Sequence, residues 1–223
     1  MKRILAAVCI FCLLFPLSIE AKEFSIRNGI KWGMNAKEII ALMADEGYSE
    51  YIEIDTYTSA GDNITLWYKD VTVASLALHV FFVIEPSESS TNFKGLGSIM
   101  YFTPSYSMLM SHQMLLDYDD LLNAIKKKYG NPTRQLSHWK NDDYKKIYTE
   151  ATAAQQGLYQ RLASWEKLQD VYIEILMNDD LAKMYSSIES LKFGPTVWVA
   201  YYSKDFIKEM NNYMNKESSN DGL

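Results

Sequence analysis

The stretch NGIKWGMNAKEIIALMADEGY, residues 28–48, contains the signals for one complete helix. Asn35 is a favourable N-cap residue, and Glu38 stands three positions later, where a capping box requires a carboxylate. The apolar residues 39, 40, 42 and 43 fall largely on one side, and Gly47 ends the pattern. The sequence therefore predicts a helix from Asn35 to Glu46, with Trp32 packed just before its start.

Strands are expected after this helix. Alternating apolar residues and one long apolar run, separated by the turn 59–62 and the loop 85–92, are typical of antiparallel sheet. The run from Val71 to Ile84 is long and almost continuously apolar, and it predicts one buried strand. The full set of expected strands in this half is Tyr51–Thr58, Asn63–Lys69, Val71–Ile84 and Gly97–Thr103.

The second half begins in the same way, with DYDDLLNAIKKKYGNP at residues 117–132. Asp117 or Asp119 is the expected N-cap, and Gly130 with Pro132 ends the helix. A partly helical stretch 142–156 follows, then strands Leu158–Trp165, Asp170–Met177 and Thr196–Ser203, and a closing helix Phe206–Asn215. The predicted fold is α+β, with helices packed on an antiparallel sheet in two helix-then-sheet units. Residues 22–215 are expected to form one domain, and 216–223 a disordered tail.

The first residues predict export. Lys2 and Arg3 precede an apolar run that ends at Leu17, and Ala21 is a small residue suited to cleavage. We therefore expect residues 1–21 to be a signal peptide and the protein to be periplasmic or secreted. The run is short for a membrane span, so a retained anchor is the less favoured interpretation, and no transmembrane segment is expected after cleavage. Lipidation of Cys9 or Cys12 is also disfavoured, because no acylation signal precedes them.

Composition narrows the classes of partner and chemistry. The formal net charge of −6 disfavours nucleic acid, and 48% apolar residues favour a folded globule. Signatures of serine hydrolases, zinc proteases and nucleotide-binding loops are absent from the sequence. The histidines His79, His112 and His138 do not stand at ligand spacing. No catalytic residue, metal site or cofactor is predicted.

Three acidic pairs leave one catalytic alternative open. Asp119-Asp120, Asp142-Asp143 and Asp179-Asp180 are interpreted as helix starts and turns. Two such carboxylates in one cleft would instead suit a hydrolase that acts on a glycan.

The aromatic content suggests a binding surface. The chain has 16 tyrosines, and Tyr101, Tyr106, Tyr201 and Tyr202 fall in or beside expected strands and loops. Exposed aromatic rings bind peptides and sugars well, and these four form the candidate surface. The alternative is that the rings simply fill the pleated sheet, which aromatic side chains also fit.

Three motifs carry a family resemblance across residues 24–203: IRNGIKWGMNAKEI, IKKKYGNP, and SWEKLQDVYIEILM. The chain resembles uncharacterised small exported bacterial proteins with a G-I-x-W-G-M-x-x-x-E-I opening and a K-Y-G-x-P helix end. It is more faintly similar to envelope proteins that repeat a helix and an antiparallel sheet, such as outer-membrane assembly lipoproteins and secreted β-lactamase inhibitors, which act by binding other proteins. The expected function is a non-catalytic exported protein that binds an envelope protein or other ligand, with the acidic hydrolase as the alternative.

Overall fold

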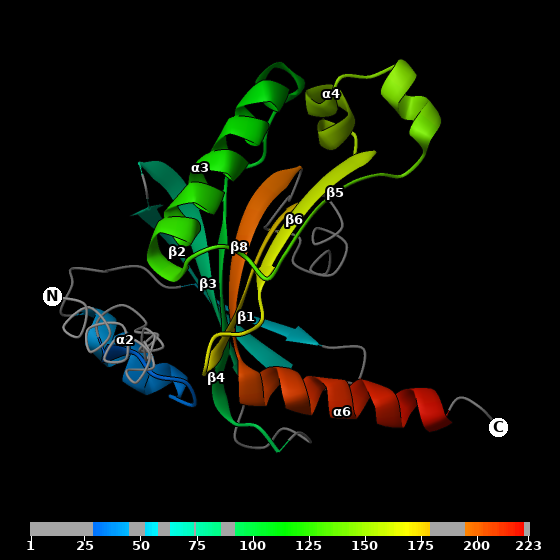
Figure 1. Ribbon diagram of the computed structural model, residues 1–223. Coiled ribbons are helices and arrows are strands. Elements are labelled where there is room, and N and C mark those ends of the chain that lie inside the picture. Colours follow the sequence, from blue (N-terminus) through cyan, green and yellow to red (C-terminus); the bar gives the residue numbers. More distant parts are fainter. Residues whose placement is uncertain are drawn as a thin grey trace, which may run out of the picture.

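The computed structural model describes residues 29–44, 52–57, 63–73, 75–85, 92–178 and 195–220. The expected signal peptide, Gly47 and the turn 59–62 lie outside these ranges. The strands of the described residues form one eight-stranded antiparallel sheet in the order β1-β2-β3-β4-β8-β7-β6-β5 (Figure 1). The strands are β1 Ile52–Tyr57, β2 Asn63–Val73, β3 Leu76–Glu85, β4 Gly95–Phe102, β5 Arg134–Trp139, β6 Tyr159–Trp165, β7 Val171–Asn178 and β8 Thr196–Ser203.

Helices precede and follow these strands. The α-helices are α2 Ala36–Ala44, α3 Ser111–Tyr129, α4 Glu150–Gln155 and α6 Lys204–Asn220, and the 3-10 helices are η2 Met108–Met110 and η3 Asp142–Lys146. The predicted α+β class, with helices on an antiparallel sheet, is therefore confirmed. Its two units are also present: α2 leads into β1–β4, and α3 leads into β5–β8.

The two units meet where their last strands pair. β4 and β8 lie antiparallel at the centre of the sheet, in a register that runs from Ser98 opposite Tyr202 to Phe102 opposite Trp198. Both strands are almost wholly buried. We call this pairing the central seam.

Opposite faces of the sheet carry different helices. α3 covers β7 and β8 through a core that includes Tyr118, Leu122, Ile175 and Val199. α2 lies on the same face over β3 and β4, where Ile39 packs among alternating strand residues. The other face receives the first turns of α6, where Phe206 contacts Met100, Trp198 and their neighbours. Figure 1 shows α6 crossing the end of the sheet and running beyond it toward the C-terminus.

The capping box predicted at α2 is confirmed. The Asn35 side chain accepts a hydrogen bond from the Glu38 N–H at 3.0 Å, and the Glu38 carboxylate accepts one from the Asn35 N–H at 2.9 Å. Trp32, just before the cap, packs against the α2 core and the α3 core at once. The Trp-Gly-Met stretch thus anchors the fold at the junction of the two units.

The backbone just before α2 is tied to the central sheet. Gly33 N–H donates to the Leu96 carbonyl at 3.0 Å, and Leu96 N–H donates to the Met34 carbonyl at 2.8 Å. Gly95 has a φ of +78°, and a Cβ there would meet the Gly33 carbonyl oxygen at 2.1 Å. Only glycine allows the two chain segments to approach this closely.

Four predictions about elements are wrong. The run Val71–Ile84 is two strands, because the chain reverses at Ser75, which adopts φ 68°. α3 begins at Ser111, not at Asp117 or Asp119, and no side chain caps it. β5 follows Pro132 where no strand was expected, and α6 continues to Asn220 beyond the predicted end at Asn215.

The glycine contact predicts a contrast between two alanine variants. Gly95→Ala should lower the free energy of unfolding by about 2 kcal/mol more than Gly33→Ala, because its methyl group would overlap fixed backbone. Gly33 has a similar φ of +82°, but its nearest neighbour, the Lys94 carbonyl oxygen, lies at 3.8 Å. Gly33→Ala should therefore cost only about 1–2 kcal/mol for the left-handed backbone. Urea unfolding measures both, and equal losses would contradict the contact.

Candidate functional site

β5 forms one margin of the sheet and pairs only with β6 among the described residues. The side chains from Arg134 to His138 are all exposed, and Trp139 is half-buried against the Tyr159 ring. A strand of this kind presents unpaired backbone groups to solvent, to which another chain can pair. We call β5 together with the following residues Lys140–Lys146 the β5 edge.

The direction of the β5 backbone groups follows from its pairing with β6. Trp139 lies opposite Tyr159 in the register of β5 and β6. The next residue, Lys140, donates its N–H to the Leu158 carbonyl at 2.9 Å. Successive residues of an antiparallel strand alternate between bonding to the partner and pointing away. Leu136 and His138 therefore bond toward β6, whereas the N–H and C=O groups of Gln135 and Ser137 point outward.

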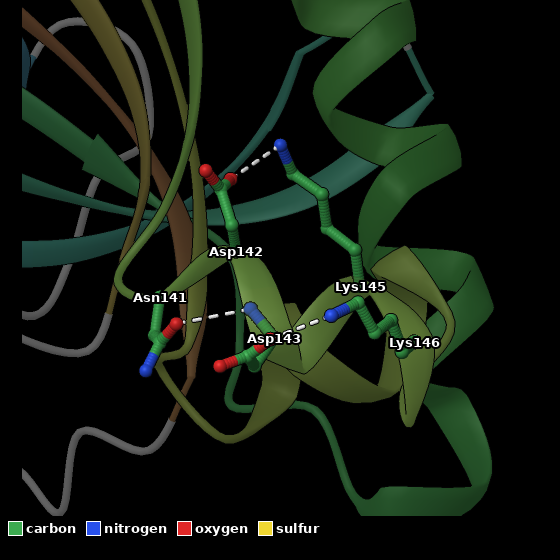
Figure 2. Close-up of polar contacts among 5 residues, drawn as sticks. All are labelled: Asn141, Asp142, Asp143, Lys145 and Lys146. Carbon is green, nitrogen blue, oxygen red and sulfur yellow. Dashed lines mark hydrogen bonds and ion pairs between the residues drawn. The ribbon is translucent and has the colours of Figure 1, made fainter.

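A short charged turn continues the β5 edge. Asn141 caps η3 by accepting a hydrogen bond from the Asp143 N–H at 2.9 Å. Lys145 pairs with Asp142 at 2.6 Å and Lys146 with Asp143 at 2.8 Å, as Figure 2 shows. The hydrogen bond from Lys145, its charge and that of His138 lower the pKa of the Asp142 carboxyl. These exposed pairs orient the turn and add little to stability.

An open depression of about 460 Å³ lies along this turn, lined by residues 137–142 and Lys145. Two large apolar side chains near it face solvent: Leu136 is 45% exposed and Ile147 is 70% exposed. Sequence reasoning missed β5 because residues 134–139 show no apolar alternation. The available signal was the clustering of lysine and arginine around that segment.

A second apolar surface stands at the start of α3. Met108, Leu109 and Met110 of η2 are exposed, Leu109 by 98%, and Leu116 in α3 is 47% exposed. A buried polar group lies beneath this turn, where the Tyr106 hydroxyl donates to Asp117 at 2.6 Å. Gln113 also donates to Asp117, at 2.7 Å.

The four candidate tyrosines do not share one surface. Tyr106 is buried beside α3, and Tyr101 and Tyr201 contact each other edge to face at 5.9 Å on the α3 side of the sheet. Tyr202 points to the opposite face, where it packs near Tyr172 and the α6 core. These rings fill the sheet core and its margins, as the alternative interpretation described.

Among the acidic pairs, Asp119, Asp142 and Asp143 each have a cationic partner. Asp119 on α3 pairs with Arg161 of β6 at 3.0 Å, and Asp142 and Asp143 pair within η3. Asp179 and Asp180 lie outside the described residues. His79 is on β3, His112 in the first turn of α3 and His138 on β5. Within the described ranges, no group of three or more metal-binding side chains occurs.

Comparison with known proteins gave no match: no family model, curated protein or solved structure matches this chain. Among the helices that the structure describes, none combines the length and apolarity that a membrane crossing requires.

The buried tyrosines predict a two-stage alkaline titration. Burial raises the pKa of Tyr129 and Tyr172 to about 12, and it raises the pKa of Tyr106, Tyr118, Tyr159 and Tyr201 as well. Their neutral forms stabilise the fold below about pH 10, the unfolded value, and this stability is lost as the pH rises further.

Tyrosinate absorbance should therefore show one group ionising near its ordinary pKa and a second ionising only as the protein unfolds. In concentrated guanidinium chloride all 16 tyrosines should titrate as one group. A single transition near pH 10 for the native protein would contradict the placement of these rings.

Proposed function

We propose that this chain is an exported, non-catalytic binding protein of the cell envelope, periplasmic or secreted, which holds a protein partner on the β5 edge. The observation that carries this proposal is an exposed edge strand that includes the exposed Leu136 and leads through η3 to the exposed Ile147. Exposed apolar side chains around unpaired backbone are typical of interaction surfaces.

Two sequence features support the export part of the proposal. The Lys2-Arg3 head, the apolar run to Leu17 and the small residue Ala21 have the pattern of a cleavable signal. The resemblance to small exported bacterial proteins points to the same compartment, and its fainter extension points to proteins that act by binding other proteins.

Export predicts a processed mature form. When the full chain is expressed in a bacterium with two membranes, we expect it in the periplasmic or culture fraction, with an N-terminus that begins at Lys22. Replacing Leu13 and Leu14 by arginine should block processing, because charge in the apolar run prevents its recognition. N-terminal sequencing of the fractionated protein measures this, and an unprocessed cytoplasmic chain would contradict export.

Binding at the β5 edge predicts a position-dependent cross-link. A photoreactive benzoylphenylalanine at Leu136 should capture a discrete partner in intact envelopes, whereas the same group at the exposed Lys208 of α6 should not. Both sites are exposed, so neither substitution should change the free energy of unfolding by more than about 0.5 kcal/mol.

The cross-linked bands are compared by mass spectrometry after illumination. The same bands from both positions, or none from position 136 under several growth conditions, would count against a binding function at this edge.

A further inference from the structure

The β5 edge offers a specific geometry for binding, which deepens the function proposed above and rests on it. Gln135 and Ser137 direct their backbone groups outward, while Leu136 and His138 hold the strand to β6. An extended segment could therefore pair with β5 as a ninth strand without breaking any existing bond of the sheet. Such strand addition obtains its affinity from the main chain and its specificity from flanking side chains.

The charges around β5 determine which charge a bound segment should carry. The charged residues from 126 to 146 are Lys126, Lys127, Lys128, Arg134, Lys140, Lys145 and Lys146, against only Asp142 and Asp143, in a chain of net charge −6. Lys126–Lys128 form the last turn of α3, which ends shortly before β5 in the chain, and Lys140 follows directly after β5. In the sequence, basic groups thus come both before and after the exposed strand.

Local ion pairs neutralise only part of this charge. Lys145 and Lys146 are paired with the two aspartates, and the charge of Arg134 acts on the Glu174 carboxyl. Within the described part of the chain, no ion pair involves Lys140 or Lys127. The charge left over at both ends of β5 is therefore positive.

The same charge disfavours pairing with a second copy of this chain. Antiparallel pairing of β5 with another β5 would bring the basic ends of both copies together, and like charges across a strand pair are destabilising. Lysine on an edge strand is one of the means by which proteins avoid self-association. A segment with acidic side chains would gain from the same groups that repel a second copy.

We infer that the β5 edge binds an extended, acidic segment of a partner protein by strand addition, with the backbone of Gln135 and Ser137 forming the ladder and Lys140 and Lys127 contacting its carboxylates.

The test uses two synthetic peptides of alternating valine and glutamate or alternating valine and lysine, capped at both ends and carrying a fluorescent label. Fluorescence anisotropy with the mature protein should show binding of the glutamate peptide, weakened by added salt, and no binding of the lysine peptide. Binding should also slow amide hydrogen exchange at Gln135 and Ser137 in the wild-type protein.

Three variants separate the backbone contribution from the charge contribution. Gln135→Pro removes an outward N–H and should weaken glutamate-peptide binding about tenfold, while Gln135→Thr keeps the N–H and should leave it unchanged. Lys140→Glu should weaken it at least about threefold and remove much of the salt dependence. Circular dichroism and thermal unfolding check that each variant is folded, and the exchange measurement stands without any variant.

Equal binding of both peptides, full binding by Gln135→Pro, or unprotected amides at Gln135 and Ser137 would each overturn strand addition. A wild-type dimer in sedimentation that Gln135→Pro dissociates would assign the edge to a second copy instead, and would overturn the acidic partner. If the envelope partner still cross-links at position 136 in the Gln135→Pro variant, the binding function stands and only the strand-addition inference fails.

Discussion

The central seam between β4 and β8 is the interaction on which the rest of the structure depends. Each helix-then-sheet unit ends in one of these two strands, so their pairing converts two four-stranded meanders into one sheet. It also decides which strands are left at the margins, because β1 and β5 are the first strands of their units and therefore lie farthest from the seam. Trp32 and the Tyr101–Tyr201 contact reinforce this junction from the face that α2 and α3 cover. The exposed edge that the proposed function uses is thus a direct outcome of pairing the units through their last strands.

Much of this fold could be predicted from the sequence wherever local chemistry and tertiary structure agree. The Asn35 and Glu38 capping box, the Gly130 stop and the strand at Thr196–Ser203 are each specified by residues next to one another. The predictions failed where a distant contact replaced the local signal. Asp117 is a favourable N-cap residue, yet it lies within α3, where its carboxylate accepts hydrogen bonds from Tyr106 and Gln113. Ser75 reverses the chain with a positive φ, a conformation that glycine, asparagine and aspartate adopt more readily than serine.

The candidate site was harder to predict, for a physical reason. Aromatic rings bind ligands well, which makes tyrosines candidates, but aromatic side chains also pack well in a wide sheet. Burial raises the pKa of several of these tyrosines. The β5 edge has the opposite character. Its residues are mostly polar and exposed and show no apolar alternation, and only their position at the end of the strand order gives them a role. The sequence of residues 134–139 alone does not indicate that this strand lies at the margin of the sheet.

The seam also determines the order in which the protein can fold. Neighbouring strands within each meander are close in sequence, whereas Ser98 and Tyr202 must meet across the whole second unit. Contacts of such wide separation form late and slowly, so each meander can take shape before the two units join. Until then β4 and β8, the strands that are almost wholly buried in the finished sheet, are both unpaired edges. The stage at which this chain is most prone to aggregate is therefore the interval before the two units join, and a chaperone that shields these strands would act there.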